Sequence, residues 1–357
     1  MLKSRIPSHR HWALVVCLLA PLGAPQAASS SGISFQHKDW ELACDNTRTC
    51  RAAGYSSDSD DMPISVLLTR KAGAAAEVTG EVQTGSFDDE RSPKQLRLQG
   101  VGKTDEVIVV PNNGFVGVLS PAQVQFLLKS ARAGSTLVFA EGKRRWTLSL
   151  DGAQAVLLKM DEAQGRLNTP TALVRKGQQP ASGVLAPLPP PVIRVPKLPA
   201  ALPQDKQLLP AIIPSLKAAL GADSHCPLLV DTTIKDKQEV MQLEARLSST
   251  QLLVSHLCWR AAYNAGYGYW VVQDRPPHKA VLVMDEGTGV GGAYSNGEIS
   301  YSQKGRGVGD CWSSGASVWN GKEFVTSEEK TTGMCRAIAN GGAWELPTYT
   351  STVIHEK

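Results

Sequence analysis

The sequence predicts an α+β fold that is mainly antiparallel β, with two small β-rich domains and a few short packed helices. The first observation is that short segments rich in β-branched residues and leucine recur along both halves of the chain, as in antiparallel sheets. The second is that half of the 22 prolines lie between Pro170 and Pro214. Proline fixes φ and lacks a backbone donor, so this stretch predicts an extended, semi-rigid linker. The predicted parts are a signal segment (1–28), an N-terminal domain (32–176), the linker (177–213) and a C-terminal domain (214–357).

The composition is that of a globular chain. Of 357 residues, 42% are hydrophobic and 20% are charged, which allows a sizeable core and excludes collagen, coiled coil and general disorder. Three of the 37 lysines and arginines lie in the predicted signal, which leaves 34 basic residues against 33 acidic ones. A near-neutral chain gives no electrostatic reason to expect nucleic-acid binding.

Residues 1–28 have the pattern of a secretory signal peptide. Lys3, Arg5 and Arg10 precede an apolar run at 12–20, and Ala27-Ala28 provides a small-residue exit. The run is far shorter than the roughly 20 residues that a membrane-spanning helix needs, and no later stretch is long enough. The sequence therefore predicts export, removal of the signal and no membrane span in the mature chain.

The N-terminal domain is predicted to begin with a hairpin. Trp40, Leu42 and Cys44 alternate with other residues, which is the period of a half-buried strand. Asp45 begins a turn, and Cys50 lies on the return strand. Further strands are predicted at 64–69, 77–83, 95–98, 107–110, 136–140 and 145–150.

Two helices interrupt these strands. Ser120-Pro121 predicts an N-cap followed by proline at the first helical position, and apolar residues then recur at helical spacing. A second helix is predicted over about 152–164, with Gly165 at its C-terminal end. Both helices should pack on the sheet through one apolar face.

The C-terminal domain is predicted to be chiefly an antiparallel meander. A short helix is expected over 214–221, and strands over 241–247 and 252–259 are joined by a turn. Asn296-Gly297 and Asn320-Gly321 each separate strand-like segments and predict type I′ hairpin turns.

Six cysteines remain once the signal segment is removed. In an exported chain an even number predicts disulfides, although six cysteines allow fifteen pairings. Proximity favours Cys44 with Cys50, Cys226 with Cys258, and Cys311 with Cys335. By chain entropy the first loop would contribute ~2.5 kcal/mol and the other two ~3.5 kcal/mol each.

Two histidines stand beside two of these cysteines, in His225-Cys226 and His256-Leu257-Cys258. Imidazole and thiolate suit zinc or copper, so His225 and His256 form a hypothetical metal site. The spacing matches no standard zinc pattern, and oxidation favours a disulfide. The expectation is therefore no bound metal.

No reaction or cofactor is predicted from sequence motifs. The segment 287–292 satisfies G-x-G-x-x-G, but a dinucleotide site needs a helix immediately afterwards, and 293–298 resembles a hairpin instead. Serine nucleophile elbows and cysteine-protease signatures are missing from the sequence. The sequence therefore predicts no cofactor and no catalytic residues.

Aromatic residues gather in the C-terminal half. Five fall within 12 residues, and two interpretations stay open. Buried, they would form core; exposed, they would make a surface for a glycan or an envelope protein, because each combines an apolar body with a polar tip. The five are Trp259, Tyr263, Tyr267, Tyr269 and Trp270.

Several strings resemble a bacterial exported family known only as domain of unknown function 1176. They are Asp39-Trp40-Glu41-Leu42-Ala43-Cys44-Asp45-Asn46, Cys50-Arg51-Ala52-Ala53-Gly54-Tyr55, Leu67-Leu68-Thr69-Arg70, Ser149-Leu150 followed by Met160-Asp161-Glu162-Ala163-Gln164-Gly165-Arg166, and Cys258 followed by Ala262-Tyr263-Asn264. The resemblance implies the Gram-negative periplasm and assigns no activity. The N-terminal half also resembles, more distantly, the invasion-associated locus B proteins.

These observations predict an exported, disulfide-bonded periplasmic protein that is not an enzyme and serves as a binding or structural factor of the cell envelope. An enzyme that hydrolyses envelope material is one alternative, and it would require a concave pocket with perturbed acids or histidines. A metal-binding protein that uses His225 and His256 is the other.

Overall fold

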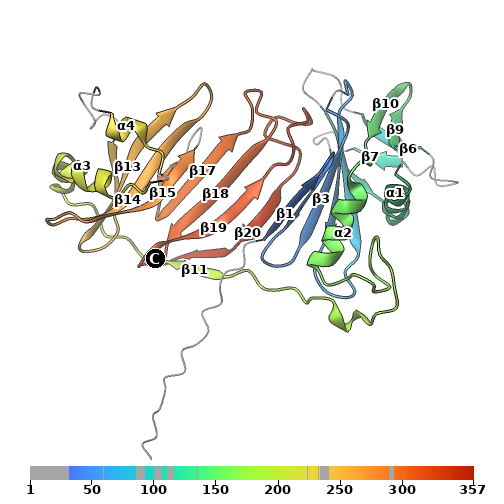
Figure 1. Cartoon of the computed structure of the whole chain (residues 1–357), viewed down its shortest axis with the longest axis horizontal. Coiled ribbons are helices and arrows are strands. Elements are labelled where there is room, and N and C mark those ends of the chain that lie inside the picture. Colours follow the sequence, from blue (N-terminus) through green and yellow to red (C-terminus); the bar gives the residue numbers. More distant parts are fainter. Residues whose placement is uncertain are drawn as a thin grey trace, which may run out of the picture. The chain divides into compact units, whose positions relative to one another are not determined.

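The computed structural model describes residues 32–58, 60–85, 93–99, 107–110, 116–134, 136–222, 224–231, 233, 241–288 and 293–357 (Figure 1). The predicted signal segment and residues 289–292 of the glycine-rich motif lie outside the described residues. The fold is mostly antiparallel β with a few short helices, which confirms the predicted fold class at this level.

The N-terminal half forms two antiparallel sheets. The strand order is β1-β2-β3-β4-β5-β8 in the six-stranded sheet and β10-β9-β6-β7 in a four-stranded sheet. Every strand predicted in this half is present to within two residues. The bounds are β1 (Ile33–His37), β2 (Trp40–Cys44), β3 (Cys50–Tyr55), β4 (Ile64–Arg70), β5 (Val78–Thr84), β6 (Gln95–Leu98), β7 (Val107–Val109), β8 (Val116–Leu119), β9 (Leu137–Glu141) and β10 (Arg144–Leu148).

Both predicted N-terminal helices are confirmed: α1 (Pro121–Ala133) and α2 (Ala153–Ala163). The side chain of Ser120 accepts from the backbone N–H of Gln123, whose side chain accepts from the N–H of Ser120, a capping box that stabilises a helix by about 1 kcal/mol. The apolar faces of both helices join one core with the six-stranded sheet and with β6, β7, β9 and β10.

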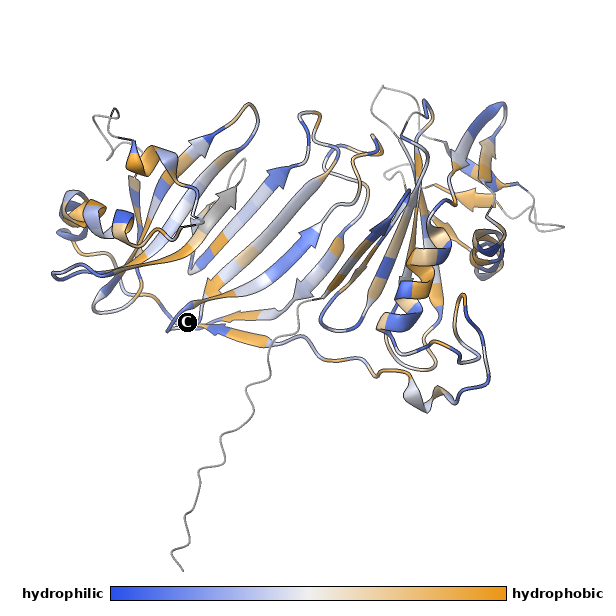
Figure 2. Cartoon of the chain, in the orientation of Figure 1, coloured by the Kyte–Doolittle hydropathy of each residue, from blue (hydrophilic) through white to orange (hydrophobic). Residues whose placement is uncertain are grey.

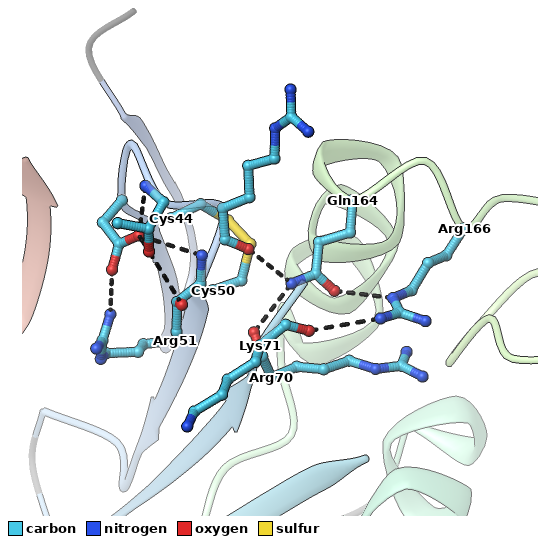
Figure 3. The surroundings of a disulfide bond; sticks show 11 residues. Cys44, Cys50, Arg51, Arg70, Lys71, Gln164 and Arg166 are labelled. Carbon is cyan, nitrogen blue, oxygen red and sulfur yellow. Dashed lines mark hydrogen bonds and ion pairs between the residues drawn. A yellow bond between two sulfur atoms is a disulfide. The ribbon is translucent and has the colours of Figure 1, made fainter. Parts of the chain in front are cut away.

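The segment after α2 is anchored to the first hairpin, close to the Cys44–Cys50 disulfide (Figure 3). Gln164 Nε2 donates to the carbonyls of Arg48 at 3.0 Å and Arg70 at 2.9 Å, and Gln164 Oε1 accepts from Arg166 Nε at 2.9 Å. Gln164 and Arg166 are both fully buried. Buried polar groups need hydrogen-bond partners. Gln164 and Arg166, which belong to one of the strings that resemble the family, therefore have a structural role.

The C-terminal half forms a four-stranded sheet, β12-β13-β14-β15, and a five-stranded sheet, β16-β17-β18-β19-β20. Short helices cover one face of the four-stranded sheet, where Cys226, Cys258 and Trp270 are buried (Figure 1). The bounds are α3 (Leu209–Ala218), α4 (Pro227–Val230), β12 (Met241–Arg246), β13 (Gln251–Arg260), β14 (Ala265–Gln273), β15 (Ala280–Thr288), β16 (Tyr294–Ser295), β17 (Glu298–Lys304), β18 (Trp312–Trp319), β19 (Phe324–Thr331) and β20 (Leu346–Thr350).

Two local predictions in this half need correction. Helix α3 begins at Leu209 rather than at Pro214, because Pro210 lies in its first turn and Pro214 is accommodated inside it. The type I′ prediction is right for Asn296-Gly297, where both residues have positive φ. It is wrong for Asn320-Gly321, where a four-residue loop joins the strands and Asn320 Oδ1 accepts two backbone N–H groups.

The proline-rich segment runs along both halves of the chain. The N–H of Leu185 donates to Gln164 at 3.0 Å, and that of Leu188 donates to Thr47 at 3.2 Å. A short strand, β11 (Val192–Val195), pairs in parallel with the last strand, β21 (Thr352–His355). This part of the chain also contains the 3₁₀ turns η1 (Ala181–Gly183) and η2 (Asp205–Leu208). Division into two domains with a linker at 177–213 stays a prediction.

Candidate functional site

A polar cleft lies on one face of the five-stranded sheet, beside β15. It encloses about 520 Å³, and Val283 and Met284 of β15 form one side. Residues that pair directly across neighbouring strands point to the same face. The register sets out two such rows: Tyr301, Gly315 and Glu329, followed by Gln303, Ser313 and Thr331.

A second cleft of about 630 Å³ shares Gln303, Ser313 and Thr331 with the first, so the two are contiguous. We call the combined depression the polar groove. Its far end is lined by Glu41 of the six-stranded sheet and by Arg336. The strands beneath it are largely blue to white in Figure 2, in contrast to the orange of α2. Most residues that line the groove are polar, and Val283, Met284 and Met334 add apolar contacts.

Tyr301 is the aromatic residue on the groove floor. A Cβ atom built on Gly315 would lie 2.4 Å from Tyr301 Oη, so the absence of a side chain at Gly315 leaves room for the phenol. Burial, followed by the charge of Glu329, raises the pKa of Tyr301. The hydroxyl is therefore protonated at neutral pH and is able to donate a hydrogen bond.

The far end of the groove contains a partly buried carboxylate. Glu41 Oε1 accepts from Tyr55 Oη at 2.7 Å and from the N–H of Met334 at 2.8 Å. Burial raises the pKa of Glu41, and the hydrogen bonds from Tyr55 and Met334 together with the charge of Arg336 oppose this rise only in part. Tyr55 is completely buried, and its pKa is raised well above the ordinary value by burial and by Glu41.

Charged groups at this end are arranged in pairs. Arg336 Nη2 lies 2.9 Å from Asp39 and its Nη1 lies 3.7 Å from Asp58. Lys304 Nζ lies 5.3 Å from the ring centre of Trp312, a cation–π distance, and Trp312 Nε1 donates to Gly309. The tryptophan ring is thus fixed at the groove wall.

Three disulfides join Cys44 to Cys50, Cys226 to Cys258 and Cys311 to Cys335, the same pairing that sequence proximity favours. Disulfides of this kind are consistent with an oxidising environment. Both sulfur-bearing residues of the third pair line the groove. A Cβ atom on Gly305 would lie 2.6 Å from the sulfur of Cys311, so the loop opposite approaches this disulfide closely.

The two hypothetical metal ligands, His225 and His256, differ in how far they are buried. His256 is completely buried, with Nδ1 2.6 Å from the carbonyl of Leu257, whereas His225 is exposed. The neighbouring thiols are bonded to each other and offer no thiolate ligand in this form. Within the described part of the chain, the group with close metal-ligand atoms is Asp310, Cys311 and Cys335, and its sulfurs also form a disulfide.

The five clustered aromatic residues divide into two groups. Trp270 and Tyr269 are buried on opposite faces of the four-stranded sheet and are core residues. Trp259 and Tyr267 are half-buried, and Tyr263 is 40% exposed. Tyr263 precedes Asn264, which exchanges hydrogen bonds with the backbone of Lys304 at the end of β17. Tyr263, the exposed aromatic residue of the five, is therefore adjacent in sequence to Asn264, which contacts Lys304 of the groove.

With this geometry in place, the family is clear from the match of residues 34–351 to the model described as a protein of unknown function, DUF1176. The chain belongs to the DUF1176 family. It is also 26% identical over 160 residues to the uncharacterized protein YpfG of Escherichia coli strain K12, across 41% of this chain and 42% of that protein. The chain thus spans less than half the length of this relative.

No solved structure matches the chain. The resemblance of the N-terminal half to invasion-associated locus B proteins stays a prediction. Of the helices in the described ranges, none has the length and apolar character needed to cross a membrane. The family assignment therefore gives relatives but no activity, and function has to be argued from the groove.

Proposed function

We propose that this protein is exported to the periplasm and acts there as a non-enzymatic binding factor of the cell envelope, with a glycan as the ligand of the polar groove. The observation that carries the proposal is the groove floor. Its two rows of paired residues present hydroxyl and amide groups, together with the carboxylate of Glu329, beside the phenol of Tyr301. Hydrogen-bonding polar groups with an aromatic ring suit a sugar, because they match its hydroxyls and its apolar ring face.

The binding test uses calorimetric titration of the oxidised protein with soluble oligomers of β-1,4-linked N-acetylglucosamine, with acetate buffer alone as the blank. Tyr301→Phe and Gln303→Ala each remove one hydrogen-bonding group from the floor, and each should weaken binding by roughly tenfold. Ser302→Ala is the matched control, since Ser302 lies on the same strand but lines neither cleft. Equal binding by all three variants, or no binding by the native protein, would refute the proposal.

Export has its own test. N-terminal sequencing of protein released from cells by osmotic shock should begin immediately after Ala28 if the predicted signal is cleaved there. The three disulfides support this location, because they persist in an oxidising compartment. Recovery of the intact chain in the cytoplasmic fraction would contradict it.

Hydrolysis of envelope glycans is the second candidate function, and one observation favours it. Glu41 lines the groove with a raised pKa, a property of general acids in glycoside hydrolysis. Its Oε1 already accepts two hydrogen bonds, which favours a structural role instead. Release of reducing ends from the same oligomers by native protein, and its loss in Glu41→Gln, would support the enzyme.

A further inference from the structure

A second cleft, separate from the polar groove, lies at the edge of the six-stranded sheet. It encloses about 620 Å³ between β5, the edge strand β8, helix α1 and the loop at 170–176. It shares no lining residue with the polar groove. Its apolar lining includes Val78, Val118, Leu119, Val124 and Leu128. Val118 and Leu119 are neighbours on β8 and point to opposite faces of the sheet, so the lining wraps around the edge of this strand.

Part of this apolar lining is open to solvent, whereas Leu119, Val124 and Leu128 are buried. Val118 is 70% exposed, and Val78 is half-buried. Large apolar side chains that line a concave surface and stay exposed mark a binding site more often than scattered surface residues do. The volume lies within the roughly 300–1,000 Å³ of small-molecule sites. The cleft therefore has the size and surface for an apolar chain.

Three cations line the same cleft against one acid. They are Arg70, Arg132 and Lys176, and the acid is Glu77. Arg132 and Lys176 are exposed at its border, and Arg132 Nη1 donates to the carbonyl of Leu173 at 3.4 Å. Two exposed cations thus belong to the lining of the cleft.

Arg70 adds a buried positive charge beneath the cleft. Its side chain is 6% exposed and donates to the carbonyls of Ala76 and Thr171. Its Nη1 lies 3.7 Å from Asp161. The positive charge of Arg166 acts on the pKa of Arg70 and on the pKa of Asp161. Burial, with Arg166, lowers the pKa of Arg70 to about 10, so it stays charged at neutral pH. Arg70 is thus paired with Asp161, and the solvent-exposed cations of the cleft lining are Arg132 and Lys176.

We propose that this cleft binds the anion of a fatty acid, with the chain along the exposed edge of β8 at Val118 and the carboxylate at Arg132 and Lys176. Charge complementarity selects this occupant: an apolar wall alone would accept any hydrocarbon, whereas a guanidinium beside it favours a carboxylate. A peptide strand added to the edge of β8 would need backbone pairing and no cations. The proposal goes beyond the glycan proposal and does not depend on it.

The test is calorimetric titration of the oxidised protein with laurate below its micelle concentration, beside dodecanol and acetate. Val118→Asp places a carboxylate on the exposed edge of β8 and should weaken laurate binding by about tenfold or more. Arg132→Gln should weaken it by about tenfold. Val109→Asp and Lys129→Gln are matched controls, since Val109 is 64% exposed, Lys129 is exposed on the same helix as Arg132, and neither lines the cleft.

Saturable laurate binding that is weakened by both cleft variants and by neither control, with dodecanol and acetate much weaker, supports the proposal. Three results would overturn it: no saturable binding of laurate, equal effects of cleft and control variants, or dodecanol binding as tightly as laurate. Should Val118→Asp fail to fold by circular dichroism, Arg132→Gln with its Lys129→Gln control decides the matter. Glycan binding in the polar groove is measured separately, so the two proposals fail independently.

Discussion

The six-stranded and five-stranded sheets are both antiparallel, yet they differ in how their faces are covered. Both faces of β4 are buried: Ile64 and Leu68 belong to the core beneath the helices, and Leu67 packs with Trp344 of the segment between β19 and β20. On the same second face, Trp344 Nε1 donates to Ser65 at 2.7 Å. The six-stranded sheet is thus a central layer.

The five-stranded sheet is covered only in part. Val318 and Trp319 of β18 are buried, while Ser313 and Ser317 of the same strand line the groove. A face of hydroxyl groups stays hydrated at little cost, whereas an apolar face requires a cover. The comparison teaches that the polar face is the surface that folding leaves open to solvent.

The largest expected effect compares one tryptophan from each region. Trp40 is completely buried in the six-stranded sheet and donates to the carbonyl of Ser149 at 2.9 Å, so Trp40→Ala should cost about 3–5 kcal/mol. Trp312 is half-buried at the groove, and Trp312→Ala should cost about 1–2 kcal/mol. Urea unfolding followed by circular dichroism measures both. Equal losses would show that the groove wall is as much part of the core as the covered sheet.

Disulfide removal sharpens the same contrast. The Cys311–Cys335 bridge holds the start of the segment that covers the six-stranded sheet, and it closes a longer loop than Cys44–Cys50. By chain entropy, the double serine variant at 311 and 335 should lose ~3.5 kcal/mol and the one at 44 and 50 ~2.5 kcal/mol. The two variants serve as controls for each other in urea unfolding. A larger loss of unfolding free energy in the variant at 44 and 50 would contradict the chain-entropy explanation.

The covering segment is also held by a buried carboxylate. Asp310 accepts from Arg306 Nε at 2.8 Å and from the N–H of Ala337 at 2.7 Å. Burial raises the pKa of Asp310, but the hydrogen bonds from Arg306 and Ala337 outweigh it, so the pKa is lowered overall. A lowered folded-state pKa means that the carboxylate stabilises the protein above about pH 4 and that this stability is lost as the pH falls through the folded-state value.

Asp310→Asn should therefore cost about 1.5–3 kcal/mol at neutral pH and progressively less below about pH 4. Urea unfolding midpoints of the native protein and the variant, measured at neutral pH and below about pH 4, give the loss at each pH. Asp61→Asn is the control, because Asp61 is exposed. A loss that is the same at both pH values would show that the carboxylate of Asp310 does not titrate with a lowered pKa.

Local sequence patterns predicted the elements well where the physics is local. Ser120-Pro121 marks the start of α1 because the cap and the proline act within one turn. Asn296-Gly297 predicts its turn because both residues tolerate positive φ. Asn320-Gly321 fails because the loop length that the flanking strands require, rather than the dipeptide, selects the turn.

The groove could not be predicted because its residues come together only in the folded chain. Glu41 and Met334, which are hydrogen-bonded there, are 293 residues apart in sequence. Serine and threonine on β18 and β19 gave no signal, since such residues are usual on any solvent-facing strand. The aromatic cluster was ambiguous for a similar reason: Tyr269 and Trp270 point to opposite faces, and both are buried because both faces of β14 are covered.

The smallest expected effect concerns Glu41, where the covered sheet reaches the open groove. Its pKa is raised in the folded state, chiefly by burial, so the folded protein binds this proton more tightly than the unfolded chain. The contribution of Glu41 to stability therefore rises as the pH falls through the folded-state pKa, and the charged form at neutral pH is the less favourable one.

Glu41→Gln keeps a carbonyl acceptor for Tyr55 and Met334 while removing the charge. At neutral pH the variant should equal the native protein or exceed it by up to about 1 kcal/mol, and this advantage should vanish near pH 4. Urea unfolding at both pH values measures it, with Tyr55→Phe as the variant that removes the hydrogen bond and leaves the carboxylate. A loss above about 2 kcal/mol at neutral pH would mean that the negative charge itself holds the Met334 segment on the covered sheet, because a neutral acceptor would then be insufficient.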